Sequence, residues 1–473
     1  MSKSTGLEGD ANEGFNADIS LTRPSPADER LGLKPARKPS TLHGQAGHKA
    51  SGGPKTPEND EAELLEKATQ PVTGLRMRVM RFTPSWYSVT MGTGICNTLL
   101  FLLPWQSTHT VFRAIGAAFL ILDIVILIAF SAMTIARYTL YPEIFMAMLG
   151  HPVHSLFLGT LPMGLVTIVA GIAFQGDAYG LNGTLEAAAG LWWFALVLSC
   201  LTAFMVPLAM QTTQKHTSES LTAAWLLPIV PPITIAAAGA TICDLLVPKH
   251  PNYALTIWIA SYIMNGIGCL LASFVLVLYF QRLSLHHIPG REVVVTTFLP
   301  LGPCGQGGYA LLQLGRVSRT LFPIISAAHP EDVDGLAILG ETANALYAFG
   351  IAFGLLVWAL GIWFAFLAVS TLIIHRVRGT IAFSMAAWSF TFPLGSLNLL
   401  TFALATTFDS MFFKIIGTVM TFCVVSLWIL VSIPTLRGFW TGDLFPAPCL
   451  VKLPDLLIAA TGEKGKQVEL QSG

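Results

Sequence analysis

The chain is 473 residues long, and 53% of its residues are hydrophobic whereas only 11% are charged. Its mean hydropathy of +0.63 excludes a soluble globular protein, and repeated apolar runs of roughly 20 residues, long enough to cross a bilayer, indicate a polytopic membrane protein. The formal net charge of zero hides an uneven distribution, because residues 1–82 hold 12 Lys and Arg whereas the much longer stretch 83–440 also holds only 12.

The first 82 residues are polar and rich in Gly, Pro, Ser, Lys and Glu. Such a composition cannot bury enough apolar surface to fold alone. We therefore predict a disordered cytoplasmic N-terminal tail over residues 1–82, either inert or regulated by phosphorylation. No apolar core of a cleavable signal peptide is found in residues 1–70, so the first membrane segment is expected to act as the signal anchor.

Ten apolar segments follow and define an expected membrane domain over residues 83–440. Every odd-numbered segment contains proline or glycine, whereas most even-numbered segments are long and uninterrupted. Broken helices at membrane depth persist only where the freed backbone groups face protein or water. We therefore predict an all-α fold of five helical hairpins whose kinked odd members surround a common axis and form a conduit. The expected spans are residues 84–103, 111–136, 155–174, 187–210, 224–246, 254–280, 293–314, 344–374, 381–407 and 411–434.

Lys and Arg are unequally divided between the two sides of these ten segments. Basic residues concentrate in the cytoplasmic loops of membrane proteins, and the richer side here is the side of both termini. We therefore predict that both termini are cytoplasmic and that residues 441–473 form a cytoplasmic C-terminal tail. The richer side holds Arg76, Arg78, Arg81, Arg137, Lys215, Arg282, Arg291, Arg376, Arg378 and Arg437, and the other side holds Arg113, Lys249, Arg316, Arg319 and Lys414.

The odd-numbered segments contain no charged residue or histidine within their expected bounds, apart from Asp244 at the end of the fifth. Cation-coupled carriers usually keep an ionisable relay at this depth, whereas hydroxyls, amides and helix N-termini hold an anion weakly enough for it to pass. The alternative is that Ser and Thr simply pack between helices, at about 0.6 kcal/mol each. The candidate pathway residues are Ser88, Gly92, Thr93, Gly94, Asn97, Thr160, Pro162, Pro231, Pro232, Gly302, Gln306, Gly307, Thr391, Pro393 and Ser396.

Phe392 stands immediately before Pro393 in the ninth segment. A side chain at such a kink is expected to project at the narrowest point of a conduit, where an apolar ring excludes water and ions until it rotates aside. Phe392 is therefore the predicted pore gate. The alternative is an ordinary packing phenylalanine, one of 29 in the chain.

No cofactor or metal is expected. His151 and His154 are close in sequence, but the intervening Pro152 disfavours a regular helix that would place both imidazoles on one face, and capping of a helix start is the favoured interpretation. Asp123, deep in the second segment, is interpreted as structural, paired with Arg113 or a buried donor. The seven cysteines lack CxxC spacing and are expected to be apolar fillers. No GxSxG, HExxH or P-loop motif occurs in the membrane domain, so no enzyme is predicted.

Four motifs along the membrane domain carry a family resemblance. They are Phe82-Thr-Pro84-Ser-Trp86-Tyr-Ser-Val-Thr-Met-Gly92-Thr-Gly94, then His151-Pro152 followed by Leu158-Gly-Thr-Leu-Pro162-Met-Gly164, then Pro300-Leu-Gly302-Pro303 with Gly305-Gln-Gly-Gly308, and Ser389-Phe-Thr-Phe392-Pro393-Leu-Gly395. Over about residues 80–440 the chain resembles the tellurite-resistance/dicarboxylate transporter family, and within it the fungal sulfite efflux pumps. It departs from that branch at Gly94-Ile-Cys96-Asn97, where small and aliphatic residues are expected after the glycine pair.

The resemblance implies ten helices arranged as five hairpins in a quasi-fivefold, slow-anion-channel-like fold, assembled as a homotrimer in the lipid bilayer. It places the blocking phenylalanine of the related anion channels at Phe392. It also implies export of sulfite or bisulfite across the plasma membrane, with no cofactor and no nucleic-acid partner. A C4-dicarboxylate (malate) transporter is the alternative, which would need an arginine or similar partner in the pathway; a membrane sensor or enzyme is a more distant one.

Overall fold

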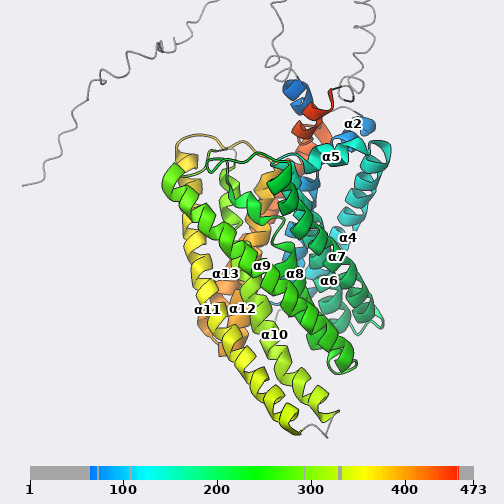
Figure 1. Ribbon diagram of the computed structural model, residues 1–473, viewed down its shortest axis with the longest axis vertical. Helices are drawn as coiled ribbons and strands as arrows, with labels where there is room; N and C mark the ends of the chain where they lie inside the picture. The colour runs from blue at the N-terminus through cyan, green and yellow to red at the C-terminus, as the bar shows by residue number, and fades with distance from the viewer. Residues whose placement is uncertain are drawn as a thin grey trace, which may run out of the picture. The chain divides into compact units, whose positions relative to one another are not determined.

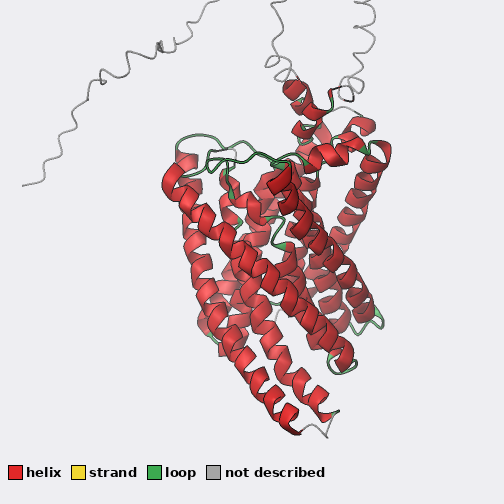
Figure 2. Ribbon diagram, in the orientation of Figure 1, coloured by secondary structure: helices red, strands yellow, loops and turns green. Residues whose placement is uncertain are grey.

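A computed structural model describes residues 64–71, 74–105, 109–291, 293–328, 333–454 and 456. The chain divides into two units, residues 1–55 and 56–473, and the described residues belong to the second. They form helices joined by loops, with no β-strand among them (Figure 2). The predicted all-α class is thus confirmed. The greater part of both predicted tails, residues 1–63 and 457–473, lies outside the described residues.

Long, continuous helices alternate with composite elements along the chain (Figure 1). Each composite element consists of a short 3₁₀ helix followed by an α-helix, and each corresponds to an odd-numbered predicted span. These are η2 (Pro84–Tyr87) with α3 (Ser88–Phe101), η4 (His154–Gly159) with α6 (Thr160–Ala178), η5 (Ala223–Leu226) with α8 (Pro231–Leu246), η6 (Val294–Phe298) with α10 (Leu301–Ala327), and η7 (Met385–Phe390) with α12 (Thr391–Phe408). The long helices are α4 (His109–Leu140), α7 (Thr184–Thr212), α9 (Pro251–His286), α11 (Val333–Val377) and α13 (Met411–Thr441).

Proline explains where most of the composite elements change from a 3₁₀ to an α-helix. Proline lacks the N–H that an interior helical residue donates, but its fixed backbone angle suits the first turn. Pro231 and Pro232 open α8, and Pro162, Pro303 and Pro393 occupy the third position of α6, α10 and α12. The predicted kinks therefore lie at the beginnings of α-helices rather than within them.

The α-helices of the composite elements contact one another in a closed circuit, from α3 to α6, α8, α10, α12 and back to α3. Their 3₁₀ helices form a second circuit in the same order. We call α3, α6, α8, α10 and α12 the inner helices, the end of the bundle with the 3₁₀ helices the turn end, and the opposite end the far end. Each long helix packs on the composite element that precedes it, and these long helices are called the outer helices.

Burial separates the inner from the outer helices. In the most apolar 18 residues of each helix, 72% and 78% of the residues are buried for the elements at His154–Ala178 and Met385–Phe408, against 17% to 33% for the five outer helices. The outer helices therefore present most of their apolar side chains away from the bundle. Such an apolar exterior requires lipid or another protein surface to cover it.

Close approach between inner helices depends on glycine at a few positions. Gly305 on α10 faces the backbone of Ser396 and Leu397 on α12, where an added Cβ would overlap main-chain atoms. Gly159, at the end of η4, meets the carbonyl group of Leu227 in the same way. Small residues allow this close backbone packing between membrane helices, so these glycines hold neighbouring composite elements together.

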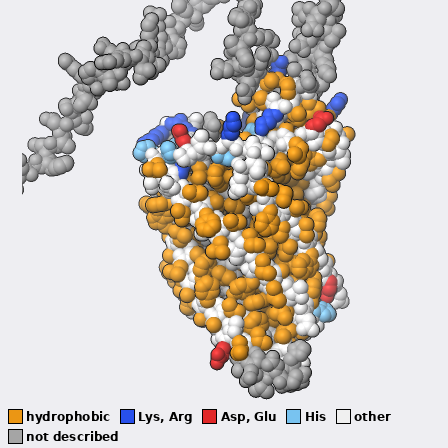
Figure 3. Space-filling model, viewed as in Figure 1, with side chains coloured by type: hydrophobic (Ala, Val, Ile, Leu, Met, Phe, Trp, Pro, Cys, Tyr) orange, Lys and Arg blue, Asp and Glu red, His pale blue; other side chains and the backbone are white. Residues whose placement is uncertain are grey.

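Seven described helices are long and apolar enough to cross a membrane, namely His109–Leu140, His154–Ala178, Thr184–Thr212, Pro251–His286, Ile338–Val377, Met385–Phe408 and Met411–Thr441. Hydrophobic side chains cover the middle of the face seen in Figure 3, while Lys, Arg and His gather at the turn end. The chain is thus a multi-pass membrane protein. The other three predicted spans correspond to α3 and α8, of 14 and 16 residues, and to α10, which continues past the predicted end at residue 314 and includes Arg316.

Two buried arginines attach the terminal segments to the turn end. The Arg81 guanidinium, beyond α2 (Leu75–Met80), donates hydrogen bonds to the carbonyl oxygens of residues 67, 68 and 70 at 2.6–3.2 Å. Arg137, near the end of α4, donates to the Met80 carbonyl at 3.0 Å. The Ala447 N–H, just before η8 (Pro448–Lys452), donates to the Ala68 carbonyl at 3.1 Å. The described parts of both predicted tails therefore pack on the bundle.

His151 caps the start of η4, just after α5 (Glu143–Leu149). Its Nδ1 atom accepts hydrogen bonds from the backbone N–H groups of Val153 and His154, each at 3.2 Å. Burial, and then the charge of Lys452, lower the pKa of His151 to about 4. The neutral imidazole, whose Nδ1 lone pair must stay free to accept these bonds, is therefore the favoured form.

Candidate functional site

Four cavities among the described residues lie along the bundle, three lined mainly by the inner helices and the turn-end one by the 3₁₀ helices and the loops beside them. They measure about 410 Å³ at the turn end, about 10 Å³ at a constriction, about 30 Å³ in the middle and about 150 Å³ at the far end. Phe392 lines both the constriction and the middle cavity. Phe174, Thr241, Tyr309 and Leu399 line both the middle and the far-end cavities. The last three cavities thus follow one another through the bundle.

The turn-end cavity lies among the 3₁₀ helices. Each 3₁₀ helix contributes to its lining, with Ser85 from η2, Leu156 from η4, Ala224 from η5, Thr296 from η6 and Met385 from η7. The chain beyond α13 contributes residues 443, 444 and 446. The cavity is therefore a vestibule at the centre of the second contact circuit.

Ionisable groups gather in this vestibule. Lys215, His216, His154 and Asp443 are all part of its lining. Burial lowers the pKa of His216, which favours its neutral form, so Lys215 and Asp443 are the basic and the acidic group on this wall. A basic group in a concave site raises the local concentration of anions.

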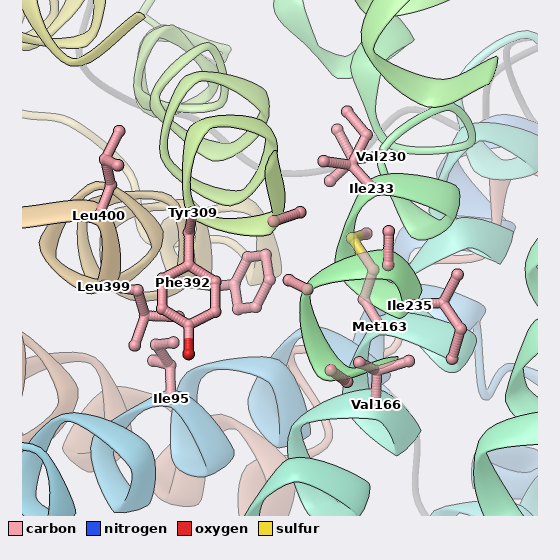
Figure 4. Packing of buried hydrophobic residues seen from close by; sticks show 14 of the residues in the cluster. Ile95, Met163, Val166, Val230, Ile233, Ile235, Tyr309, Phe392, Leu399 and Leu400 are labelled. Carbon is pink, nitrogen blue, oxygen red and sulfur yellow. The ribbon is translucent and has the colours of Figure 1, made fainter. Parts of the chain in front are cut away.

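The constriction is closed by apolar side chains. Met91, Met163, Leu226, Leu227, Val230, Leu299, Phe392 and Pro393 line it. The Phe392 side chain is 2% exposed, and Figure 4 shows it with Tyr309 on one side of the interior and Met163, Val166 and Val230 on the other. Since a water molecule needs about 10–15 Å³ and polar partners, this small apolar space is unfavourable for water.

The middle cavity beyond Phe392 has hydroxyl and amide groups on its wall, contributed by Thr98, Thr167, Thr234, Thr241, Gln306 and Tyr309. The Thr167 and Thr234 hydroxyls donate to carbonyl groups of their own helices at 2.7 and 2.9 Å. Gln306 donates from Nε2 to the Ser396 hydroxyl at 3.2 Å. An ion in this cavity would have to exchange these bonds for its own, so the wall can hold it only weakly.

The far-end cavity contains an ion pair between two inner helices. Arg316 on α10 donates from Nη2 to Asp244 Oδ2 on α8 at 2.7 Å. Gln313, one turn before Arg316, also lines this cavity. The far-end cavity therefore has a positive and a negative side chain on its wall. The described lining of the constriction and of the middle cavity contains no charged side chain.

Of the candidate pathway residues, Gln306, Pro393 and the predicted gate Phe392 line these cavities. Gly302, in the first turn of α10, is buried, yet nothing lies within 4 Å of where its Cβ would be. This glycine therefore faces open space inside the bundle.

The predicted hydroxyl-bearing residues mostly bond to the surrounding backbone. Thr160 donates to the Pro84 carbonyl at 2.8 Å, Thr391 donates to the Trp388 carbonyl at 2.9 Å, and Ser396 donates to the Phe392 carbonyl at 2.8 Å. Thr93 accepts a hydrogen bond from Trp428 Nε1 at 3.0 Å, which turns it toward outer helix α13. Ser88 is buried and lines none of the four cavities.

The remaining candidates lie at helix contacts. An added Cβ at Gly92 would meet Thr391 and Trp388, one at Gly94 would meet Thr167 and Asp123, and one at Gly307 would meet Cys269 on α9. Asn97 accepts at Oδ1 from Gln175 Nε2 at 3.0 Å. The prolines Pro162, Pro231 and Pro232 stand in the first turns of their helices.

Of the two expected partners of Asp123, Arg113 is not one, and the expected buried donor remains. The Arg113 guanidinium lies over the Phe101 ring, 4.8 Å from its centroid. Asp123 is fully buried, and the Thr167 hydroxyl is the side-chain donor beside its carboxyl group. Its carboxyl group lies against Gly94 on α3, next to the hydroxyl of Thr167. Outer helix α4 thus places the carboxyl group of Asp123 against inner helices α3 and α6.

Sequence reasoning missed several lining residues, notably Tyr309, Gln313 and Arg316 on α10 and Thr241 on α8. The sequence does contain a pattern that indicates these residues, because the α10 residues 306, 309, 313 and 316 are spaced so that they share one face of a helix. Residues 234, 241 and 244 follow the same spacing on α8. Thr241 meets Tyr309, with the two hydroxyl oxygens 3.4 Å apart, and so the two polar stripes face each other.

Comparison with known proteins gives one consistent result. A family model described as voltage-dependent anion channel (SLAC1) matches residues 81–436. The chain is 38% identical to the sulfite efflux pump SSU1 of Arthroderma otae over 372 residues, which is 78% of this chain and 93% of that protein. It is also 38% identical to the sulfite efflux pump SSU1 of Arthroderma benhamiae over 370 residues, with the same shares covered. A more distant relative, at 25% over 389 residues (81% of this chain and 84% of that protein), is the malic acid transport protein of Schizosaccharomyces pombe.

Proposed function

The chain belongs to the voltage-dependent anion channel (SLAC1) family, and from this premise we propose that it exports sulfite or bisulfite across the plasma membrane and so protects the cell from sulfite. The family match bears out the resemblance drawn from the motifs. The family and these relatives are channels and transporters, not enzymes. The observation that carries the proposal is the row of cavities through the inner helices, interrupted at Phe392.

We propose that the domain over residues 83–440 has ten membrane-spanning helices, arranged as five hairpins in quasi-fivefold order around the cavities. Two observations support this arrangement. The inner helices contact each other in a closed circuit, and each outer helix packs on the composite element before it. The short α3 and α8 are each preceded by a 3₁₀ helix, which lengthens the segment available to cross the bilayer.

In this proposal Phe392 is the gate, and the ion passes from the vestibule through the constriction into the middle cavity. Lys215 attracts anions into the vestibule, whose wall also carries Asp443, and the ring of Phe392 keeps the apolar constriction closed. Once the ring turns aside, the passing ion exchanges its hydration for Gln306, Tyr309 and the threonine hydroxyls. Their existing hydrogen bonds compete with the ion, so it binds weakly and moves on. Gly302 provides space beside this route, while the other glycines keep the helices closely packed.

We further propose that the turn end and both termini are cytoplasmic and that the protein is a homotrimer. Lys and Arg gather at the turn end (Figure 3), as the distribution of basic residues in cytoplasmic loops requires. Both terminal tails, over residues 1–82 and 441–473, then lie on the cytoplasmic side. The exposed apolar faces of the outer helices suit contact with lipid or with a neighbouring subunit.

Anion flux into or out of proteoliposomes containing the purified full-length protein tests the proposal. Sulfite, malate and chloride are compared under a set membrane potential and pH gradient, with protein-free liposomes as the control. We expect voltage-dependent sulfite flux well above that of the other two anions. The absence of sulfite flux from folded protein would refute the proposed function.

One observation favours a second candidate, transport of a C4-dicarboxylate such as malate. Such a substrate calls for a strong carboxylate partner in the pathway, and Arg316 provides one at the far-end cavity, beyond the span bounds drawn from the sequence. The same flux assay decides between the two substrates, because a malate flux exceeding the sulfite flux would favour this candidate.

A further inference from the structure

We propose that Arg316 and Asp244 form a release site for the transported oxyanion at the far end of the pathway, in which Asp244 competes with the anion for Arg316. This inference rests on the proposed anion-transport function and adds a site to it. The constriction and the middle cavity have no described charged residue on their walls. An anion that leaves the middle cavity therefore meets its first described cation at Arg316.

The position of Arg316 follows from the polar stripe on α10. Gln306 lines the middle cavity with Phe392, Tyr309 lines both the middle and the far-end cavities, and Gln313 and Arg316 line the far-end cavity. These side chains lie on successive turns of one helix face. An anion moving away from Phe392 can therefore pass from one donor to the next until it reaches the guanidinium group.

The far-end cavity is large enough for this role. Its volume of about 150 Å³ compares with about 30 Å³ for the middle cavity, so the far-end cavity can hold a partly hydrated oxyanion. The Arg316 and Asp244 side chains are 45% and 41% exposed, which means that water reaches both partners. A guanidinium group has five N–H donors in a planar fork that suits oxyanions, and the hydrogen bond that Arg316 makes among the described residues takes up one of them.

Asp244 gives the site its releasing property. An unpaired arginine would hold a divalent oxyanion too firmly, since conduction requires binding that is favourable enough for entry and weak enough for exit. The Asp244 carboxylate, 2.7 Å from Arg316 Nη2, can form its ion pair with the guanidinium again as the anion departs. The site then returns to the ion pair that the structure contains, and the next anion finds it unoccupied.

Arg319 provides a matched control. It lies three residues beyond Arg316 on α10 and carries the same charge, but its guanidinium lies over the Tyr347 ring on α11, 5.1 Å from the ring centroid. Arg319 lines none of the four cavities. An effect of general surface charge should therefore appear in both Arg316→Gln and Arg319→Gln, whereas an effect of the release site should appear only in Arg316→Gln.

The test measures sulfite flux in right-side-out and inverted vesicles that contain the full-length protein, with sulfite varied on the receiving side. Because the far end can bind returning sulfite, flux toward that end should be inhibited by sulfite in the receiving solution. Arg316→Gln should raise the half-inhibiting concentration about fivefold, and Asp244→Asn should lower it about two- to fivefold, the range expected for an exposed ion pair. Arg319→Gln should match the wild type.

The outcomes separate the release site from the proposed function itself. If wild-type vesicles transport sulfite but all three variants show wild-type inhibition in both orientations, the release site is refuted while the transport function stands. Equal effects of Arg316→Gln and Arg319→Gln would also refute it, because they would reflect surface charge. If the wild type carries no sulfite at all, both proposals are overturned. Thermal melting and gel filtration of each variant ensure that folded protein is compared.

Discussion

Replacing Phe392 with alanine is expected to open the closed pathway. The ring separates the constriction from the middle cavity and lines both, and it is 2% exposed. Its removal joins the two spaces and adds the volume of the ring to them. The apolar barrier is then replaced by a passage that water can enter.

The size of the effect follows from hydration. The constriction, at about 10 Å³, is at the lower limit for a single water, whereas the joined space exceeds the roughly 10–15 Å³ that one water needs. An ion stripped of water in an apolar space carries a penalty of several kcal/mol. Each 1.4 kcal/mol taken from that barrier raises the flux about tenfold, so we expect at least a tenfold increase for Phe392→Ala and a smaller one for Phe392→Leu.

The assay is passive sulfite flux in proteoliposomes at a fixed membrane potential, normalised to folded protein. Folding must be measured because a buried phenylalanine-to-alanine change costs about 3–5 kcal/mol in protein cores. Phe390→Ala is the matched control, since Phe390 packs edge-on against Phe298 with ring centroids 5.0 Å apart and lines none of the cavities. Unchanged flux through folded Phe392→Ala, or an equal increase with Phe390→Ala, would refute the gate.

Four further substitutions test the packing and two ionisable groups. Gly305→Ala, whose Cβ would overlap the α12 backbone, should reduce the yield of folded protein in gel filtration, whereas Gly302→Ala, whose Cβ meets open space, should not; equal behaviour of the two would contradict the close contact. Asp123→Asn should keep or raise the melting temperature, because the amide oxygen of Asn can still accept from the Thr167 hydroxyl beside it, whereas a carboxylate at the bilayer centre costs about 3 kcal/mol. A large drop would indicate a partner that requires the ionised form. Because the pKa of His151 is lowered from 6.5 to about 4, the folded state resists protonation of this group, and the stability that it contributes above pH 6.5 is lost as the pH falls from 6.5 to 4. His151→Gln should therefore weaken the dependence of the melting temperature on pH between 6.5 and 4. A pH dependence equal to that of the wild type would exclude His151 as the cause of the dependence.

Much of the architecture could be read from local sequence properties. Apolar length and composition predict which segments are membrane helices, since both are properties of a single segment. Proline likewise marks a helix start wherever it stands, as Pro162 and Pro393 do. The family was also recognisable from ordered motifs, which the match over residues 81–436 confirms.

The site was harder to predict, because the sequence does not determine the orientation of each helix about its own axis. That orientation decides which side chains face the interior of the bundle. Gly94 and Thr93 are adjacent in sequence, yet Gly94 meets Thr167 and Asp123 while Thr93 bonds to Trp428. The ends of helices were similarly undetermined, and the continuation of α10 past residue 314 brings Arg316 into the far-end cavity.

The sequence by itself determined that this is an all-α membrane protein of the anion-channel family, with proline-marked helices alternating with continuous ones. Only the tertiary structure decided that Phe392 stands between two cavities, that Arg113 turns away from Asp123, and that Arg316 meets Asp244, 72 residues away. The physical reason is that helix formation and bilayer insertion depend on neighbours along the chain, whereas the rotation and contacts of each helix depend on how glycines and large side chains of other helices pack against it.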